Sequence, residues 1–280
     1  MKPVCIVIMV LLAACTRGNP VSSGYMDTTL FLFSDETLST RAATPDEDRV
    51  SDWNLFIFNS FGDLEEQVYA PGSPTLVHTT RLLREHPYTL VAAANMGYQL
   101  PFHSLADARA FRYRLAYPDE YAEGLPMTAV LEDVLITREM PVRLERLMAR
   151  IDIRIDRREL APDVLFKVTD ISVGNCPSSV SLFPGSGVET ASQAFPQGFS
   201  LHNMEVAALN RDQADALSES ASLYLLENCN QLHESYLEIK AEYHAEDYHT
   251  DPGEPLTYRI PLGEVVRNTV YPITVSVHAL

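Results

Sequence analysis

The chain has 280 residues, of which 46% are hydrophobic, and a formal net charge of −17. This length allows one large or two ordinary domains with cores of their own, and the hydrophobic content is typical of a folded protein. A surface this acidic repels phosphate backbones and anionic headgroups, so we expect no nucleic-acid partner and no electrostatic adhesion to lipid.

The N-terminal stretch has the organisation of a secretory signal. Lys2 precedes an apolar run over residues 4–14, too short for a membrane-spanning helix, which needs about 20 apolar residues. Its end, Leu-Ala-Ala-Cys, resembles a bacterial lipobox, which implies cleavage between Ala14 and Cys15 and acylation of Cys15. Several acyl chains anchor a protein stably. The alternative is an ordinary signal peptide cut near Ala14, with Cys15 a bystander.

Strand-like segments dominate the first half. After a polar tether over residues 15–24, strands are expected at residues 25–33, 53–58, 64–69, 76–80 and 88–94. The acidic segment 34–50 contains a proline and predicts an exposed loop. Asn-Ser-Phe-Gly-Asp between the second and third segments predicts a hairpin. A short surface helix is expected at residues 104–114, with Ser104 as its N-cap.

Residues 141–156 combine two patterns. Leu144 and Leu147 suit a helix, whereas Ile151, Ile153 and Ile155 alternate with charged residues, as in a half-buried strand. We predict one long strand, bulged near Arg146, that closes a first domain at residue 157.

The second half repeats this style. Strands are expected at residues 165–173, 180–183, 222–227, 236–243, 256–262 and 271–279. One short helix is expected within residues 204–218. Many strands with few helices predict an all-β fold of antiparallel β-sandwiches. The expected organisation is a signal peptide (1–14), a lipidated tether (15–24), and two β-sandwich domains (25–157 and 158–280).

No catalytic constellation stands out. The sequence has no nucleophile elbow, Gly-rich phosphate loop or zinc-type His-Glu-x-x-His motif, so we expect no enzyme and no cofactor. The densest polar cluster comprises His244, Asp247, His249 and Asp251. Its position between two expected strands favours a solvated turn, and we predict no metal site.

The cysteines and aromatic residues leave two questions open. Once the signal and the lipidated residue are set aside, Cys176 and Cys229 remain, and they either form a disulfide in an oxidising envelope or stay separate buried thiols. Trp53 is expected in a core. A glycan-binding surface would have to use tyrosines instead, among them Tyr25, Tyr69, Tyr98, Tyr113, Tyr117 and Tyr121.

Several stretches, in this order, carry a family resemblance: DWNLFIFNSFGDL (52–64), YTLVAAANMG (88–97), LPM (125–127), LERLMARIDI (144–153), LYLLEN (223–228) and YRIPLGEVVRNTVYPITVSV (258–277). Together they resemble the fimbrillin-type fimbrial proteins of Bacteroidales, most closely their FimB-like lipoprotein anchor subunits. The resemblance implies two tandem transthyretin-like β-sandwiches and a non-enzymatic subunit that fixes a fimbria to the outer membrane at the cell surface.

The resemblance also implies a partner, a fimbrial stalk subunit that donates a β-strand to a sheet edge of this chain. A candidate strand-exchange interface combines the first and last strands, through Leu30, Phe31, Leu32, Phe33, Tyr271, Ile273, Val275 and Val277. The expected last strand ends just before Leu280, which suits an acceptor without a donor segment. Arg41 is either a proteolytic site, as in fimbrillin stalks, or a plain loop residue. The competing functions are a surface glycan-binding lipoprotein and a lipoprotein hydrolase.

Overall fold

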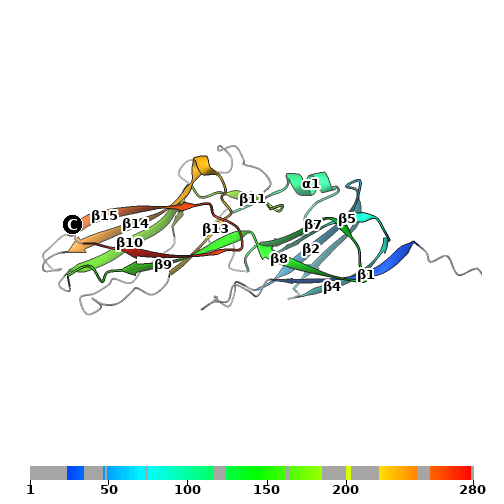
Figure 1. Cartoon of the computed structure of the whole chain (residues 1–280), viewed down its shortest axis with the longest axis horizontal. Helices are drawn as coiled ribbons and strands as arrows, with labels where there is room; N and C mark the ends of the chain where they lie inside the picture. Colours follow the sequence, from blue (N-terminus) through cyan, green and yellow to red (C-terminus); the bar gives the residue numbers. More distant parts are fainter. Residues whose placement is uncertain are drawn as a thin grey trace, which may run out of the picture.

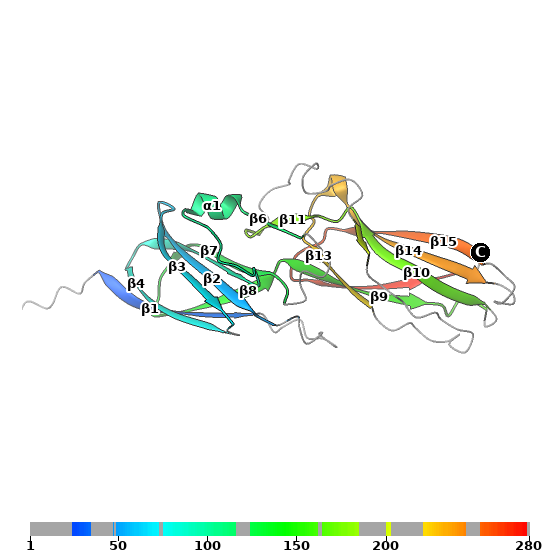
Figure 2. The ribbon, with the colours of Figure 1, turned by 180° about the vertical axis from the view of Figure 1, so that it is seen from behind.

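The computed structural model describes residues 24–34, 47, 49–72, 75–115, 124–161, 164–184, 200–202, 221–244 and 253–278. Regular structure in these residues is nearly all β-strand, arranged in two lobes that follow one another along the long axis (Figure 1). The view from behind shows the same two lobes, with the helix α1 beside the first (Figure 2). The expected all-β fold with sandwich-like sheets is therefore confirmed. No helix in the described segments is long and apolar enough to cross a membrane.

Among the described residues, the first lobe consists of one seven-stranded sheet. Its strand order is β3-β2-β5-β7-β8-β1-β4. Its strands are β1 (Tyr25–Ser34), β2 (Asp52–Asn59), β3 (Leu64–Pro71), β4 (Leu76–Leu83), β5 (Pro87–Ala94), β7 (Met127–Leu135) and β8 (Glu139–Arg146). β7 and β8 pair at only two positions, where the sheet folds over. The inward side chains of its two halves then form one buried cluster around Leu30, Trp53 and Val142.

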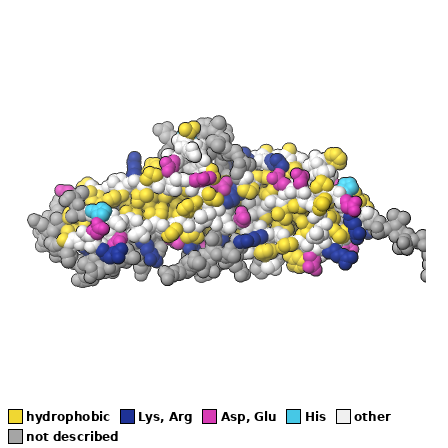
Figure 3. Space-filling view, viewed as in Figure 1, with side chains coloured by type: hydrophobic (Ala, Val, Ile, Leu, Met, Phe, Trp, Pro, Cys, Tyr) yellow, Lys and Arg dark blue, Asp and Glu magenta, His cyan; other side chains and the backbone are white. Residues whose placement is uncertain are grey.

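The second lobe stacks two smaller sheets, β12-β10-β14-β15 and β13-β9-β16. Their strands are β9 (Met148–Asp156), β10 (Leu165–Gly174), β12 (Ser200–His202), β13 (Ala221–Leu226), β14 (Ser235–His244), β15 (Glu254–Gly263) and β16 (Val270–Ser276), with a 3₁₀ turn at Gln231–His233. Ile153, Val173 and Leu237 belong to the core between the sheets. Tyr258 and Ile273, on the edge strands, are only partly buried, and hydrophobic side chains line this lobe in Figure 3.

Residues 95–115 cover the outer face of the first sandwich. The predicted helix forms as α1 (Leu105–Ala110), and the Ser104 side chain accepts a hydrogen bond from the Asp107 N–H, as an N-cap does. Beneath it, Phe102 lies against Phe56, with ring centroids 4.7 Å apart. The next strand, β6 (Arg112–Arg114), pairs with β11 (Ser179–Ser181) from the second half of the chain. This short ribbon connects the lobes.

The strand expected over residues 141–156 is divided. β8 ends at Arg146 and belongs to the first sandwich, whereas β9 begins at Met148 and pairs with β13 and β16. Leu147 is the single residue between them, and its side chain is fully buried. The sheet partners therefore change at Leu147, and the domain boundary at residue 157 stays a prediction.

Candidate strand-exchange site

The first strand, β1, is hydrogen-bonded along both of its edges. It pairs antiparallel with β4 over eight residue pairs and parallel with β8 over six. β1 is the first strand that the structure describes, and it lies between β8 and β4 in the sheet. A strand that took its place would have to satisfy both ladders.

The side chains of β1 alternate between the core and the solvent. Leu30 and Leu32 are 0% and 2% exposed and belong to the core of the first sandwich, whereas Phe31 and Phe33 are 37% and 39% exposed. This alternation follows the period of two in an extended strand. The inward leucines hold β1 in the sandwich, because burying one leucine side chain is worth about 1.5–3 kcal/mol.

One inward position of β1 fits its surroundings poorly. The Thr28 side chain is 0% exposed, and its Oγ1 has no hydrogen-bond partner. A buried hydroxyl without a partner costs about 1–3 kcal/mol. Two ladders and two leucines therefore hold the first strand in place, and the unpaired Thr28 hydroxyl lowers the stability that they provide.

The strands that flank β1 have supports of their own. β4 is the edge of the sheet, and its His78 ring lies 2.7 Å (Nε2 to Oε1) from the Glu66 carboxylate of β3, the opposite edge. Thr80 of β4 also donates a short hydrogen bond to Glu66. On the other side, Val142 and Leu144 of β8 are buried in the shared core. Both walls of the slot that β1 fills therefore have contacts that do not involve β1.

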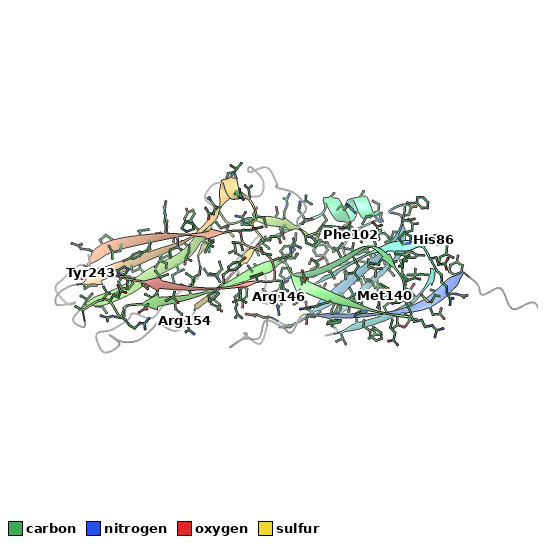
Figure 4. The ribbon with its side chains drawn as sticks, in the orientation of Figure 1. His86, Phe102, Met140, Arg146, Arg154 and Tyr243 are labelled. Carbon is green, nitrogen blue, oxygen red and sulfur yellow. The ribbon has the colours of Figure 1, made fainter. Side chains whose placement is uncertain are left out.

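The connection from β1 to β2 is fixed to the second sandwich by a buried carboxylate. Glu47 is 5% exposed, and both of its oxygens accept hydrogen bonds from Arg150 Nη1 of β9, at 3.0 and 3.1 Å. Tyr224 of β13 donates a short hydrogen bond to the same carboxylate. Arg146, at the junction of the lobes in Figure 4, donates from Nε to the Glu47 carbonyl oxygen at 3.3 Å.

We call this group the Glu47 cluster (Glu47, Arg146, Arg150 and Tyr224), and it contains one carboxylate and two guanidinium groups. Burial alone would lower the pKa of the Arg150 guanidinium, but hydrogen bonds and the charge of Glu47, together with Asp152, outweigh burial and raise that pKa. Paired charges of this kind tolerate burial, whereas an unpaired one does not.

The last strand does not join the first. β16 belongs to the three-stranded sheet of the second sandwich, where it runs parallel to β9. Our expectation that the first and last strands close one sandwich was therefore wrong. The reason is that the chain turns into a second sandwich at β9, so its last strand completes that sandwich instead. Tyr271, Ile273, Val275 and Val277 lie in the second lobe, and the candidate site reduces to β1 with β4 and β8.

The two remaining cysteines are not bridged in the structure. Cys176 is buried and Cys229 is exposed, so their sulfurs lie in different environments and the disulfide alternative is not realised. The Cys176 Sγ donates instead to the Pro177 carbonyl oxygen, and burial raises the pKa of this thiol to about 12. For Cys229, burial, a hydrogen bond with Glu264 and nearby carboxylates raise the thiol pKa to about 11.

Other predicted positions fall partly outside the described residues. Ala14, Cys15, Arg41, Asp247, His249 and Asp251 lie in segments that the structure does not describe. His244, from the same polar cluster, is buried at the end of β14. The described residues contain no group of histidine, cysteine or acidic side chains arranged to hold a metal. Trp53 is 0% exposed, which confirms its expected place in the core.

Sequence reasoning missed the Glu47 cluster. Glu47 lies in an acidic segment whose composition indicates exposure, and its partners Arg150 and Tyr224 are 103 and 177 residues away along the chain. The one available signal was Arg150 itself, a charged residue within the apolar stretch from Leu147 to Ile151.

Comparisons with known proteins give a consistent fold. No family model matches the chain, and no curated protein does. Among solved structures, a Bacteroides eggerthii protein provisionally described as a cell adhesion protein has a TM-score of 0.61 at 15% identity, over 94% of this chain and 89% of its own. A fimbrilin (FimA) from Porphyromonas gingivalis has a TM-score of 0.58 at 14% identity, over 90% of both chains.

The tip fimbrial protein Mfa3 from Porphyromonas gingivalis, with a C-terminal truncation, is also similar. Its TM-score is 0.56 at 16% identity, over 91% of this chain and 96% of its own. At these identities the likeness establishes a shared fold that extends over both lobes.

Proposed function

We propose that this chain is a lipid-anchored fimbrial subunit, held in the outer membrane through Cys15 and joined to a stalk subunit by strand exchange at β1. Its role is structural, without turnover or cofactor. The observation that carries the proposal is the fold, which follows fimbrial proteins of known structure over about nine-tenths of the chain. The ordered family motifs in the sequence support the same role.

The site around β1 is suited to exchange for a physical reason. β1 is the first described strand, and the walls of its slot, β4 and β8, are held by Glu66 and by the core without it. Loss of β1 would expose unpaired backbone groups on both walls and a groove lined by Leu55 and Val142. Such a groove binds an extended segment through main-chain hydrogen bonds, and its pockets for alternate side chains fix the register. In this proposal, β1 closes the groove until a stalk strand replaces it.

The anchor is tested by Cys15→Ser in cells. We expect the variant to leave the outer-membrane fraction and the fimbriae to be shed into the medium, with the fold unchanged because Cys15 precedes every described element. Cys229→Ser, which removes an exposed thiol from the second lobe, is the matched control and should leave both protein and fimbriae in place. Retention of the Cys15 variant in the membrane would refute the anchor.

The groove is tested by deleting residues 22–34 and adding back a synthetic peptide of residues 24–34. We expect the shortened protein to bind this peptide and to aggregate in its absence, because an open apolar edge pairs with other chains. A peptide with aspartate at the positions of Leu30 and Leu32 is the control and should not bind. Equal solubility and equal binding of the intact and shortened proteins would show that β1 does not close a groove.

A further inference from the structure

A pocket lies where the turn after β5 meets the segment that contains β6. It has a volume of about 420 Å³ and is formed by the turn after β5, the segment that contains β6, and Gly124. Its lining includes Tyr98, Phe111, Arg112, Tyr113 and Arg114. This pocket has no part in the strand exchange proposed for β1.

The turn that presents Tyr98 is held by buried polar side chains. Asp52, 3% exposed, accepts hydrogen bonds from the backbone N–H groups of Met96 at 3.2 Å and Gly97 at 2.9 Å. Asn54, 0% exposed, donates to the Tyr98 carbonyl oxygen at 3.1 Å and accepts from the Leu100 N–H at 2.8 Å. Two polar residues in the apolar strand β2 are thus used to fix one turn. Burying them has a cost that only their full set of hydrogen bonds offsets.

A third residue fixes the same turn from the other side. Asn95 has a left-handed backbone with φ of 61°, and its side-chain nitrogen donates to the carbonyl oxygens of Arg49 and Leu125, at 2.8 and 2.7 Å. Gly124 packs so closely that an added Cβ would lie 2.5 Å from the Arg49 oxygen. A turn held by this many side-chain hydrogen bonds presents its side chains in a fixed place before a ligand arrives.

The chemistry of the lining is cationic and aromatic. The ionisable groups that line the pocket are Arg112, Arg114 and two tyrosines, and no carboxylate is among the described lining residues. The Arg112 guanidinium donates hydrogen bonds to the carbonyl oxygens of Arg109 and Phe111, and these bonds hold it in position. The described lining therefore carries two positive charges in a chain whose net charge is −17. Tyr98 is 53% exposed, so its ring is accessible.

We propose that this pocket binds an acidic oligosaccharide, a chain of sugar rings that carry carboxylates. A guanidinium is the donor best matched to a carboxylate, because its planar fork can make two parallel hydrogen bonds. An exposed tyrosine ring offers a flat apolar surface to the face of a sugar ring, and its hydroxyl offers a hydrogen bond. An acidic peptide shares the charge but lacks the rigid ring that the fixed tyrosine is suited to contact, so we favour the sugar.

The experiment is a binding titration of the full-length protein with a trimer of galacturonic acid, followed by calorimetry and by ligand-observed NMR. A neutral galactose trimer and a hexaglutamate peptide are run in parallel. We expect the acidic trimer to bind at least roughly tenfold more tightly than either, with an affinity that falls as salt is raised. Arg114→Gln and Tyr98→Ala should each weaken it by roughly tenfold.

Matched controls separate this site from general surface effects. Arg154→Gln removes an exposed arginine from β9 in the second lobe (Figure 4), and Tyr25→Ala removes a tyrosine that is 50% exposed on β1; neither residue lines the pocket. Both should bind like wild type. No binding of the acidic trimer, equal loss in the control variants, or tighter binding of the peptide than of the sugar would each overturn the proposal. Unchanged thermal unfolding of Arg114→Gln would show that its loss of binding is not a loss of fold.

Discussion

Replacing Glu47 by alanine tests the contact between the β1–β2 connection and the second sandwich. The variant leaves Arg150, 5% exposed, without the carboxylate that accepts the hydrogen bonds of its Nη1. Breaking a buried ion pair by removing one partner costs about 3–5 kcal/mol. Asp152 still accepts a hydrogen bond from Arg150 at 3.1 Å. We therefore expect the free energy of unfolding to fall by about 3 kcal/mol, the lower end of that range.

The assay is urea denaturation in a Cys15→Ser background, which lacks the proposed acylation site. Fluorescence of Trp53, the single tryptophan, reports on the first sandwich, and far-ultraviolet circular dichroism reports on both lobes. Glu145→Ala, which truncates an exposed glutamate of β8, is the matched control and should change stability by no more than about 0.5 kcal/mol.

A double-mutant cycle isolates the pair itself. Glu47→Gln and Arg150→Met are measured singly and together, and we expect a coupling of about 1–3 kcal/mol, because residues in direct contact are not additive. A loss below about 1 kcal/mol for Glu47→Ala, or additive effects in the cycle, would show that the Glu47 cluster is not the buried ion pair described above.

Three further outcomes follow from other contacts. Thr28→Val removes the buried hydroxyl that has no partner and keeps the shape, so it should raise the free energy of unfolding by about 1 kcal/mol in urea. Hydrogen bonds from Arg158 lower the pKa of Asp156 to about 2, so its contribution to stability is present above about pH 4 and is lost as pH falls toward 2; a carboxyl pKa near 4 by NMR would contradict this. Non-reducing mass spectrometry should find Cys176 and Cys229 both free, and a thiol reagent should modify native Cys176 far more slowly than Cys229.

Local patterns predicted those elements whose determinants are local. The hairpin of β2 and β3 forms as expected, since Asn59 accepts hydrogen bonds from the Phe61 and Asp63 N–H groups and Gly62 adopts a positive φ of 84°. The cap at Ser104 and the alternation of Ile151 and Ile153 also follow from short-range rules.

Local patterns could not predict which strands pair over long distances in the sequence. The buried hydrophobic residues of β8 fall on even positions, such as Val142 and Leu144, whereas the buried isoleucines of β9, such as Ile151, fall on odd positions. This change of phase is visible in the sequence, but a bulge within one strand and a transfer between two sheets produce the same change. Only the partners of β9, which lie more than 60 residues further along the chain, distinguish the two.

The place of Glu47 determines how far a departing β1 can disturb the molecule. Between Ser34 and Glu47 lies the segment 35–46, and Glu47 is bonded to β9 and β13 of the second sandwich. If β1 leaves its slot, the displacement can therefore end at Glu47, and β2 and the second sandwich keep their contacts.

This arrangement makes it possible to change the binding of a strand in the slot and the free energy of unfolding independently of one another. Thr28→Val acts inside the slot, so it should both stabilise the intact protein and slow its exchange with a stalk-derived strand. Glu47→Gln weakens a contact outside the slot, so it should lower the free energy of unfolding while the affinity of the shortened protein for the peptide of residues 24–34 stays the same. If Glu47→Gln changed that affinity as much as it changed stability, the slot and the Glu47 cluster would form one cooperative unit, and β1 could not exchange without loosening the second sandwich.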